Sequence, residues 1–156
     1  MAETARARNN PPMRIRALTA ATSTLALPLL EAQYREHRIE MGGPRLRRAL
    51  RLLLPRGGAV LFASDGAEAA GVAVLSYLVA LEQGGRVAWL EELYVAPHRR
   101  GQGLGRALLL AAFANARKSG CKTVELEVVR GHDRAAHLYL RESFHRLPRT
   151  RFSRAL

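Results

Sequence analysis

The amino-acid sequence predicts an α/β protein, with an α+β mixed sheet that carries helices on its faces. A chain of 156 residues, 48% of them hydrophobic, is long enough for one domain with a buried core. Segments with the two-residue alternation of strands are interleaved with segments whose apolar residues recur at helical spacing. The expected order, β-α-α-β-β-β-α-β-α-β-β, contains a run of strands that can pair directly and leaves helices to cover the sheet.

Residues 1–12 are rich in charge and proline and are expected to be a flexible tail, so that residues 13–156 form a single domain. A hydroxyl residue before the first helix is expected to cap it, and the sequence MGGP ends it. Proline is favourable at the start of a helix, so Pro44 is expected to open the second one. The elements expected in this half are a strand at 14–18, helices at 25–39 and 44–54, and strands at 59–64 and 69–81.

The second half of the domain is expected to continue the sheet after Gly84 and Gly85. A glycine-rich loop then separates a strand from a helix with many leucines and alanines. The elements expected here are a strand at 86–95, a helix at 102–118, a strand at 123–129, a helix at 132–143, and short terminal strands near 144–147 and 149–154.

The formal net charge of +12 raises a nucleic-acid-binding interpretation. However, the basic residues are spread from Arg6 to Arg154, and nearly all of them are arginine. Aromatic residues make up 6% of the chain and are not interleaved with the arginines, as base stacking would require. A solvated basic surface is therefore favoured and nucleic acid is not an expected partner, although a positive field would still attract an anionic cofactor.

Cys121 is the single cysteine, which excludes an intramolecular disulfide and fits a reducing compartment. Residues 13–32 imitate a signal peptide, but threonines and a serine interrupt their apolar region. No run approaches the roughly 20 apolar residues of a membrane span. The sequence therefore predicts a cytoplasmic protein with no membrane partner and no metal, and it leaves a homodimer open.

The loop at 101–105 has glycine at alternate positions between a strand and a helix. Backbone N–H groups at a helix N-terminus bind anions, so this arrangement predicts a phosphate site. A Walker loop is excluded because Arg106 and Ala107 follow Gly105 where lysine and serine or threonine are needed. A dinucleotide fingerprint counted from Gly101 fails because its third glycine would fall at Arg106.

The segment Arg100-Gly101-Gln102-Gly103-Leu104-Gly105 satisfies a third pattern, Arg/Gln-x-x-Gly-x-Gly/Ala. Together with LEELYVAP at 90–97 and RAAHLYLRESF at 134–144, it resembles the GNAT superfamily of acetyl-CoA-dependent N-acetyltransferases. The resemblance covers roughly residues 72–152, and the upstream order of elements agrees with it. It implies a GNAT-like fold whose central sheet is splayed, with the strands at 86–95 and 123–129 separating to admit the thioester.

The resemblance also implies that acetyl-CoA is the cosubstrate. In such enzymes the loop amides bind the pyrophosphate, nearby arginines add charge, and the end of the preceding strand pairs with the pantetheine arm. His132 stands where the family often has asparagine, and Ser143 where it often has glycine; the second difference is expected to be conformational. The positions that the resemblance implies for coenzyme A are Leu93, Tyr94, Val95, Arg99, Arg100, Gly101, Gln102, Gly103, Leu104, Gly105, Arg106, His132 and Tyr139.

Two adjacent carboxylates are the candidates for proton transfer. Freeing the lone pair of a lysine-like amine at pH 7 costs about 4.6 kcal/mol, so a carboxylate base or anchor helps an enzyme that acylates amines. Glu91 and Glu92 interrupt an otherwise apolar strand, where charge is costly unless it is used. Simple alternation places them on opposite faces, so that only one enters the cleft. The resemblance favours Glu91, but a bulge in this strand would exchange the two faces.

The resemblance assigns the leaving thiolate to Tyr139, as a hydrogen-bond donor that strengthens its bond while charge develops. It places the acceptor site at the first two helices and their link, where Glu31 and Tyr34, together with Glu91, are the expected substrate-binding residues. Acidic residues there suit a small cationic amine acetylated by direct attack in a ternary complex. A protein or peptide amine, and a module that binds acetyl-CoA without turnover, are the alternatives.

Overall fold

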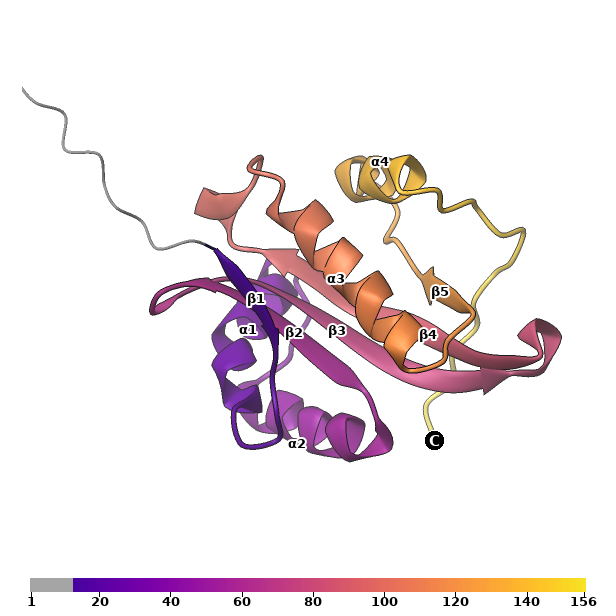
Figure 1. Ribbon diagram of the computed structural model, residues 1–156, viewed down its shortest axis with the longest axis horizontal. Helices are drawn as coiled ribbons and strands as arrows, with labels where there is room; N and C mark the ends of the chain where they lie inside the picture. Colours follow the sequence, from indigo (N-terminus) through magenta and orange to yellow (C-terminus); the bar gives the residue numbers. More distant parts are fainter. Residues whose placement is uncertain (1–12) are drawn as a thin grey trace, which may run out of the picture. The chain divides into compact units, whose positions relative to one another are not determined.

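The computed structural model describes residues 13–156, which form two compact units, one ending at Leu126 and the other spanning Glu127–Leu156 (Figure 1). The predicted flexible tail at 1–12 lies outside the described residues. The single domain expected over 13–156 stays a prediction.

The first unit is built on a five-stranded sheet in the order β1-β2-β3-β4-β5. The strands β1 (Arg14–Ala17), β2 (Ala59–Asp65), β3 (Glu68–Ala80) and β4 (Gly85–Val95) pair antiparallel in succession, and β5 (Thr123–Leu126) joins β4 in parallel. Gly66 (φ 55°) and Gly84 (φ 62°) supply the left-handed residues that the tight connections need. This mixed sheet confirms the predicted fold class.

Helices cover both faces of this sheet. On one face lie α1 (Leu27–Glu36), preceded by the 3-10 turn η1 (Ser23–Ala26), and α2 (Gly43–Leu53), extended by η2 (Leu54–Arg56), while α3 (Leu104–Lys118) lies on the other (Figure 1). Alternation along β3 explains the two layers, because Val72 and Val74 pack with the leucines of α1 and α2. A Cβ on Gly71, which directly precedes Val72, would instead lie 2.8 Å from Leu108 of α3. No helix of residues 13–156 combines the length and apolar character needed to cross a membrane.

The first helix does not begin as predicted. Ala26 is the N-cap of α1, Pro28 lies in its first turn, and no side chain caps it. The hydroxyl residues instead shape the preceding turn, where the amide of Thr19 donates to Thr22 Oγ1 over 2.9 Å. The expected hydroxyl cap is therefore wrong, because η1 separates these residues from the start of α1.

The two predicted terminal strands are absent. Residues 144–156 form no strand, and the strand predicted at 123–129 is shortened to β5. Pro148 cannot donate to a strand ladder, and Leu147 and Phe152 are both exposed, so pairing would bury no apolar face. The shortening of β5 leaves β4 running on to Val95 beyond their last pair, Leu90 with Leu126. The two strands therefore stop pairing partway along β4, as a splayed sheet requires.

The second unit contains α4 (Asp133–Arg141), which ends in a Schellman motif. The amide of Phe144 donates to the carbonyl of Tyr139 over 3.0 Å, and the amide of Ser143 donates to that of Leu140 over 3.2 Å. Ser143 occupies the left-handed position with φ 66°, which explains why the family often has glycine there. The motif brings the rings of Tyr139 and Phe144 into an edge-to-face contact, with centroids 5.6 Å apart.

Replacing Ser143 with glycine should stabilise the end of α4. A left-handed conformation costs a residue with a Cβ roughly 1–2 kcal/mol, and part of this gain is offset by the extra freedom of glycine in the unfolded chain. The net gain of about 0.5–1 kcal/mol should slow hydrogen exchange of the Phe144 amide roughly two- to fivefold. Ser143→Ala is the matched control and should not slow it, since alanine carries the same steric cost as serine.

Candidate functional site

A β-bulge in β4 determines how the two candidate carboxylates are presented. Val74 of β3 pairs with Glu92, but the next residue, Leu75, pairs with Leu90. Glu91 is therefore the extra residue on β4, and the simple alternation that sets neighbouring side chains on opposite faces fails at this point. The bulge that the sequence left open as an alternative is present.

The bulge turns both carboxylates toward the face that α1 and α2 cover. Glu92 accepts hydrogen bonds from Gln33 Nε2, over 2.7 Å, and from the Tyr34 hydroxyl, both on α1. Glu91 accepts one from Ser76, which lies two residues beyond Val74 and so on the same side of β3. The expectation that Glu91 and Glu92 lie on opposite faces is therefore wrong. Glu92 lies partly buried beneath α1, whereas Glu91 is exposed.

Burial dominates the electrostatics of Glu92 and raises the pKa of its carboxyl group. The hydrogen bond from Tyr34 opposes this rise, the negative charge of Glu91 adds to it, and the hydrogen bond from Gln33 opposes it again. Burial also raises the pKa of Tyr34 far above its ordinary value, and Glu92 adds to that shift. Tyr34 therefore stays protonated as a permanent donor. Glu92 is a carboxylate whose proton affinity is shifted toward that of a general base.

Gln33 is a site residue that the sequence analysis missed. It is 5% exposed and lies on α1 beside the buried Leu29 and Leu30. Gln33 follows Leu30 by three positions and Leu29 by four, so it falls on the apolar stripe of the helix. This position could have identified Gln33 from the sequence, because a polar residue on a buried stripe needs a polar partner.

The predicted phosphate loop joins β4 to α3 by the 3-10 turn η4 (Pro97–Arg99) and three following glycines. Gly101 (φ 76°) and Gly103 (φ 80°) are left-handed, and a Cβ on either would meet nothing within 4 Å. The glycines are therefore required by backbone conformation, and their outer side faces open space. Gly105 lies inside the first turn of α3.

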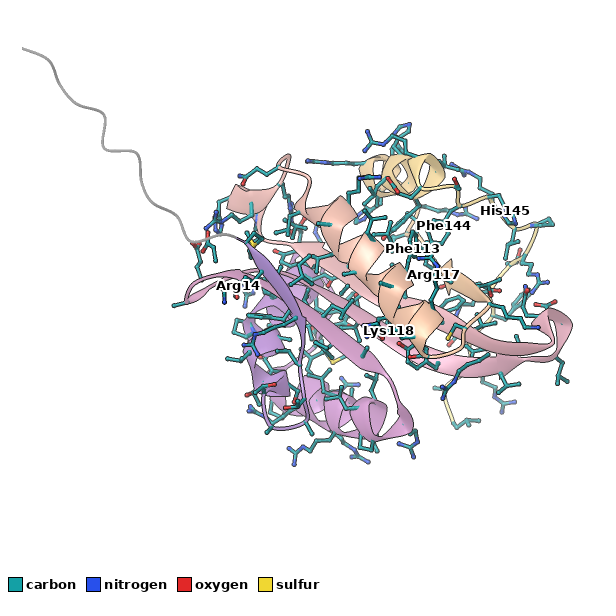
Figure 2. All side chains as sticks on the ribbon, in the orientation of Figure 1. Arg14, Phe113, Arg117, Lys118, Phe144 and His145 are labelled. Carbon is teal, nitrogen blue, oxygen red and sulfur yellow. The ribbon has the colours of Figure 1, made fainter. Side chains whose placement is uncertain are left out.

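The N-terminus of α3 keeps the properties of an anion site. Gly103 is the N-cap, no side chain caps the helix, and its first turn contains no acidic residue. Figure 2 shows Arg117 and Lys118 at the opposite end, where positive charge is favourable to the helix dipole. The first amides of α3 thus meet no acidic side chain from their own turn, which suits a phosphate group.

The two arginines before the loop are held by carboxylates of the first unit. Arg99 pairs with Asp65 and, over 2.8 Å, with Glu68, so that its side chain is 14% exposed. These two acids flank the turn between β2 and β3, which therefore braces η4. The charge that the sequence assigned to phosphate binding is partly neutralised at Arg99.

Arg100 is held on the other side of the loop. Its Nη2 lies 2.7 Å from a carboxylate oxygen of Glu36, the last residue of α1, and its Nε donates to the Val95 carbonyl over 2.9 Å. The guanidinium also lies over the ring of Tyr94, 5.3 Å from the centroid. Direct binding of phosphate by Arg99 or Arg100 stays a prediction.

The residues predicted to bind the pantetheine arm lie where β4 has outrun β5. Leu93, Tyr94 and Val95 pair with β3 on one side, and β5 does not reach them on the other. The ring of Tyr94 is buried in the core with α1 and α2, so only its backbone is placed for strand-like pairing. Pairing of a ligand with this edge stays a prediction.

The remaining predicted residues fall into separate places. Glu31 lines a shallow hollow on α1 with Arg35, Ile39 and Met41, whereas Tyr34 faces Glu92. His132 and Tyr139 belong to the second unit, at the N-cap and in the last turn of α4. Among residues 13–156, no group of His, Cys, Asp and Glu side chains is arranged to hold a metal ion.

A model of the acetyltransferase (GNAT) family matches residues 25–144. No curated protein sequence matches the chain significantly. The residues matched by the family model include both carboxylates, the glycine loop and Tyr139, which are the residues that carried the resemblance.

Solved structures share the fold at low sequence identity. An aminoglycoside N-acetyltransferase, AAC(6')-Iy in complex with CoA, has a TM-score of 0.81 at 18% identity, covering 95% of this chain and 97% of that chain. An acetyltransferase from Trypanosoma brucei has a TM-score of 0.72 at 23% identity, covering 92% and 100%. A ribosomal-protein-alanine N-acetyltransferase from Brucella melitensis has a TM-score of 0.73 at 19% identity, covering 93% and 99%. With most of its length matched by the family model and its fold shared with these enzymes, this chain belongs to the GNAT family of acetyltransferases.

Proposed function

We propose that this protein transfers an acetyl group from acetyl-CoA to the primary amine of a small cationic molecule, by direct attack in a ternary complex. The observation that carries the proposal is the acidic pair on the β4 bulge, in which Glu92 is partly buried and has a raised pKa. The strand that carries this pair leads through the glycine loop to the uncapped N-terminus of α3. An amine acceptor and an anionic cosubstrate would thus bind to adjoining parts of one strand-loop-helix segment.

The loop fits coenzyme A on two observations: the open space over Gly101 and Gly103, and the absence of an acidic residue or side-chain cap at the start of α3. The amides of residues 101–106 would hold the pyrophosphate, and the free edge of Leu93 to Val95 would hold the pantetheine arm. When bound, acetyl-CoA supplies the acyl group as a thioester.

Glu92 is proposed to accept the proton that the acceptor must lose before its nitrogen can attack. Removing that proton costs about 4.6 kcal/mol at pH 7 for a lysine-like amine, and a carboxylate whose pKa is raised by burial offsets part of this cost. Glu91, exposed on the same face, is proposed to hold the ammonium form. Tyr139 is proposed to donate a hydrogen bond to the sulfur as negative charge develops on it.

Release of free thiol from acetyl-CoA, measured over a panel of primary amines, tests the function directly. The panel should contain a monoamine such as n-butylamine, a diamine such as 1,4-diaminobutane, aminoglycosides and a peptide with N-terminal alanine. The peptide represents the second candidate acceptor class, because a ribosomal-protein-alanine N-acetyltransferase shares the fold. Faster turnover of polyamines than of the peptide is expected; the reverse order would contradict the small cationic acceptor.

Coenzyme A should protect the folded state against thermal unfolding. At a concentration one hundred times Kd, the stabilisation is about 2.7 kcal/mol. Gly103→Val should abolish this protection, since a β-branched residue disfavours the left-handed conformation at φ 80° and blocks the approach to the loop. Gly84→Val is the matched control: Gly84 is also left-handed and open but lies between β3 and β4, so the variant should lose stability and keep the protection. Equal protection in both variants would refute the loop assignment.

Glu92→Gln should lower kcat/KM more than Glu91→Gln, and most strongly at low pH. Little free amine exists there, so the reaction depends most on the base, and the deficit should shrink as the pH approaches the pKa of the amine. Because burial raises the pKa of Glu92, the acidic limb of the wild-type profile should lie above the ordinary pKa of glutamate. If Glu91→Gln gives the pH-dependent deficit instead, the roles of the two carboxylates are reversed.

Tyr139→Phe should lower kcat by roughly 10²–10⁴, the usual contribution of a positioned acid. Phenylalanine keeps the ring that packs against Phe144, so stability and protection by coenzyme A should change little. An acyl donor with a more acidic thiol should recover part of the rate, because its leaving group needs less stabilisation. Weak binding of acetyl-CoA with normal turnover at saturation would instead make Tyr139 a cofactor-binding residue.

A further inference from the structure

The amide of Gln33 is buried with one of its two polar ends unused. Its side chain is 5% exposed, and Nε2 donates to Glu92 Oε2 over 2.7 Å. Its Oε1 atom is also buried and accepts no hydrogen bond from any described residue. A buried acceptor without a donor destabilises a folded protein, so this end of the amide does not stabilise the fold.

A leucine or methionine at this position would carry no unpaired acceptor, but it would leave Glu92 Oε2 without the donor that Gln33 supplies. The neighbouring buried residues of α1, Leu29 and Leu30, are apolar, as the core stripe of a helix requires. Within residues 13–156, the one hydrogen bond that the structure shows for the Gln33 side chain is the one that its Nε2 donates to Glu92. Compared with an apolar residue, Gln33 therefore acts on the orientation and the ionisation of the Glu92 carboxylate.

The two donors on α1 divide the oxygens of Glu92 between them. Gln33 donates to Oε2 and the Tyr34 hydroxyl donates to Oε1, so the carboxylate is fixed at both ends. Hydrogen bonds to the charged form favour ionisation, which opposes the effect of burial and of the neighbouring Glu91. Glu91 receives its hydrogen bond from Ser76 of β3 instead, so α1 acts on only one of the two carboxylates.

We infer that Gln33 is a positioning residue, which holds the carboxylate of Glu92 in one orientation and in its ionised form, ready to accept a proton. The inference deepens the proposed function and rests on it for the role of Glu92 as a base. The effect of Gln33 on the ionisation of Glu92, however, can be measured without any turnover.

The direct test is a carbon-13 NMR titration of the Glu92 carboxyl group in wild type and in Gln33→Met. Methionine keeps the length of the side chain and removes the donor. The pKa of Glu92 should rise by about one unit, the usual size of a hydrogen bond to a charged group. Leu30→Met is the matched control, since Leu30 is buried in the same helix at 2% exposure and is not a hydrogen-bonding partner of Glu92. An unchanged pKa in Gln33→Met would overturn the inference.

Kinetics with the best amine of the panel supply the second measurement. The acidic limb of kcat/KM should move to higher pH by the same amount in Gln33→Met, kcat should fall, and KM for acetyl-CoA should stay unchanged. The melting temperature measured above the pKa of Glu92 should fall slightly, because losing the donor disfavours the ionised carboxylate in the folded state, whereas removing the unpaired Oε1 acts in the opposite direction. A lower melting temperature with an unmoved limb would show that Gln33 is only a packing residue.

Gln33→Leu keeps the test decisive if the methionine variant does not fold. It also removes the donor and places at position 33 the residue type that α1 already buries at positions 29 and 30, so the pKa of Glu92 should rise as in Gln33→Met. No rise would overturn the inference. If wild type releases no thiol with any amine, the proposed function fails by itself, and the NMR titration still decides whether Gln33 controls the ionisation of Glu92.

Discussion

The extra residue in β4 is the constraint on which the candidate site depends. A regular strand would send one of two adjacent carboxylates into the layer beneath α3, where the buried side chains of that helix are leucines and alanines. The bulge at Glu91 shifts the register of β4 against β3 by one residue, so both acids act on the face of α1 and α2. It occurs where β4 also loses its pairing with β5, and it therefore coincides with the start of the splay.

The helix α1 stabilises one of the two carboxylates and so makes their surroundings different. Its two adjacent polar residues, Gln33 and Tyr34, satisfy the buried acid with donors, whereas the exposed acid relies on solvent and on Ser76. Two chemically identical side chains thereby differ in burial and in hydrogen-bond partners, and burial raises the pKa of Glu92. The end of α1 is also tied to the phosphate loop, because Glu36 pairs with Arg100. The helix α1 therefore contacts both the carboxylate pair on β4 and an arginine beside the glycine loop.

The basic residues of the chain act differently at the glycine loop than over the rest of the surface. The net charge of +12 gives a field that favours an anionic cosubstrate at long range. At short range, Arg99 and Arg100 are paired with carboxylates and serve to brace η4. Under the proposed function, backbone amides fixed in direction by the left-handed Gly101 and Gly103 would supply local attraction for phosphate without any cost in side-chain entropy.

The sequence by itself determined the elements of the first unit, the fold class and the family, because alternation, helical spacing and the glycine loop are local signals. It also located the conformational role of Ser143, whose left-handed backbone follows from its place after α4. The terminal strands were predicted wrongly because strand formation depends on a partner and a buried face, and neither exists for the exposed residues around Pro148. Only the tertiary structure decided which acid is buried, which carboxylates pair with Arg99 and Arg100, and that Gln33 contacts Glu92. These outcomes depend on the pairing register of β3 with β4 and on contacts between residues far apart in the chain, and the one-residue shift that creates the bulge leaves no periodic signal in the sequence.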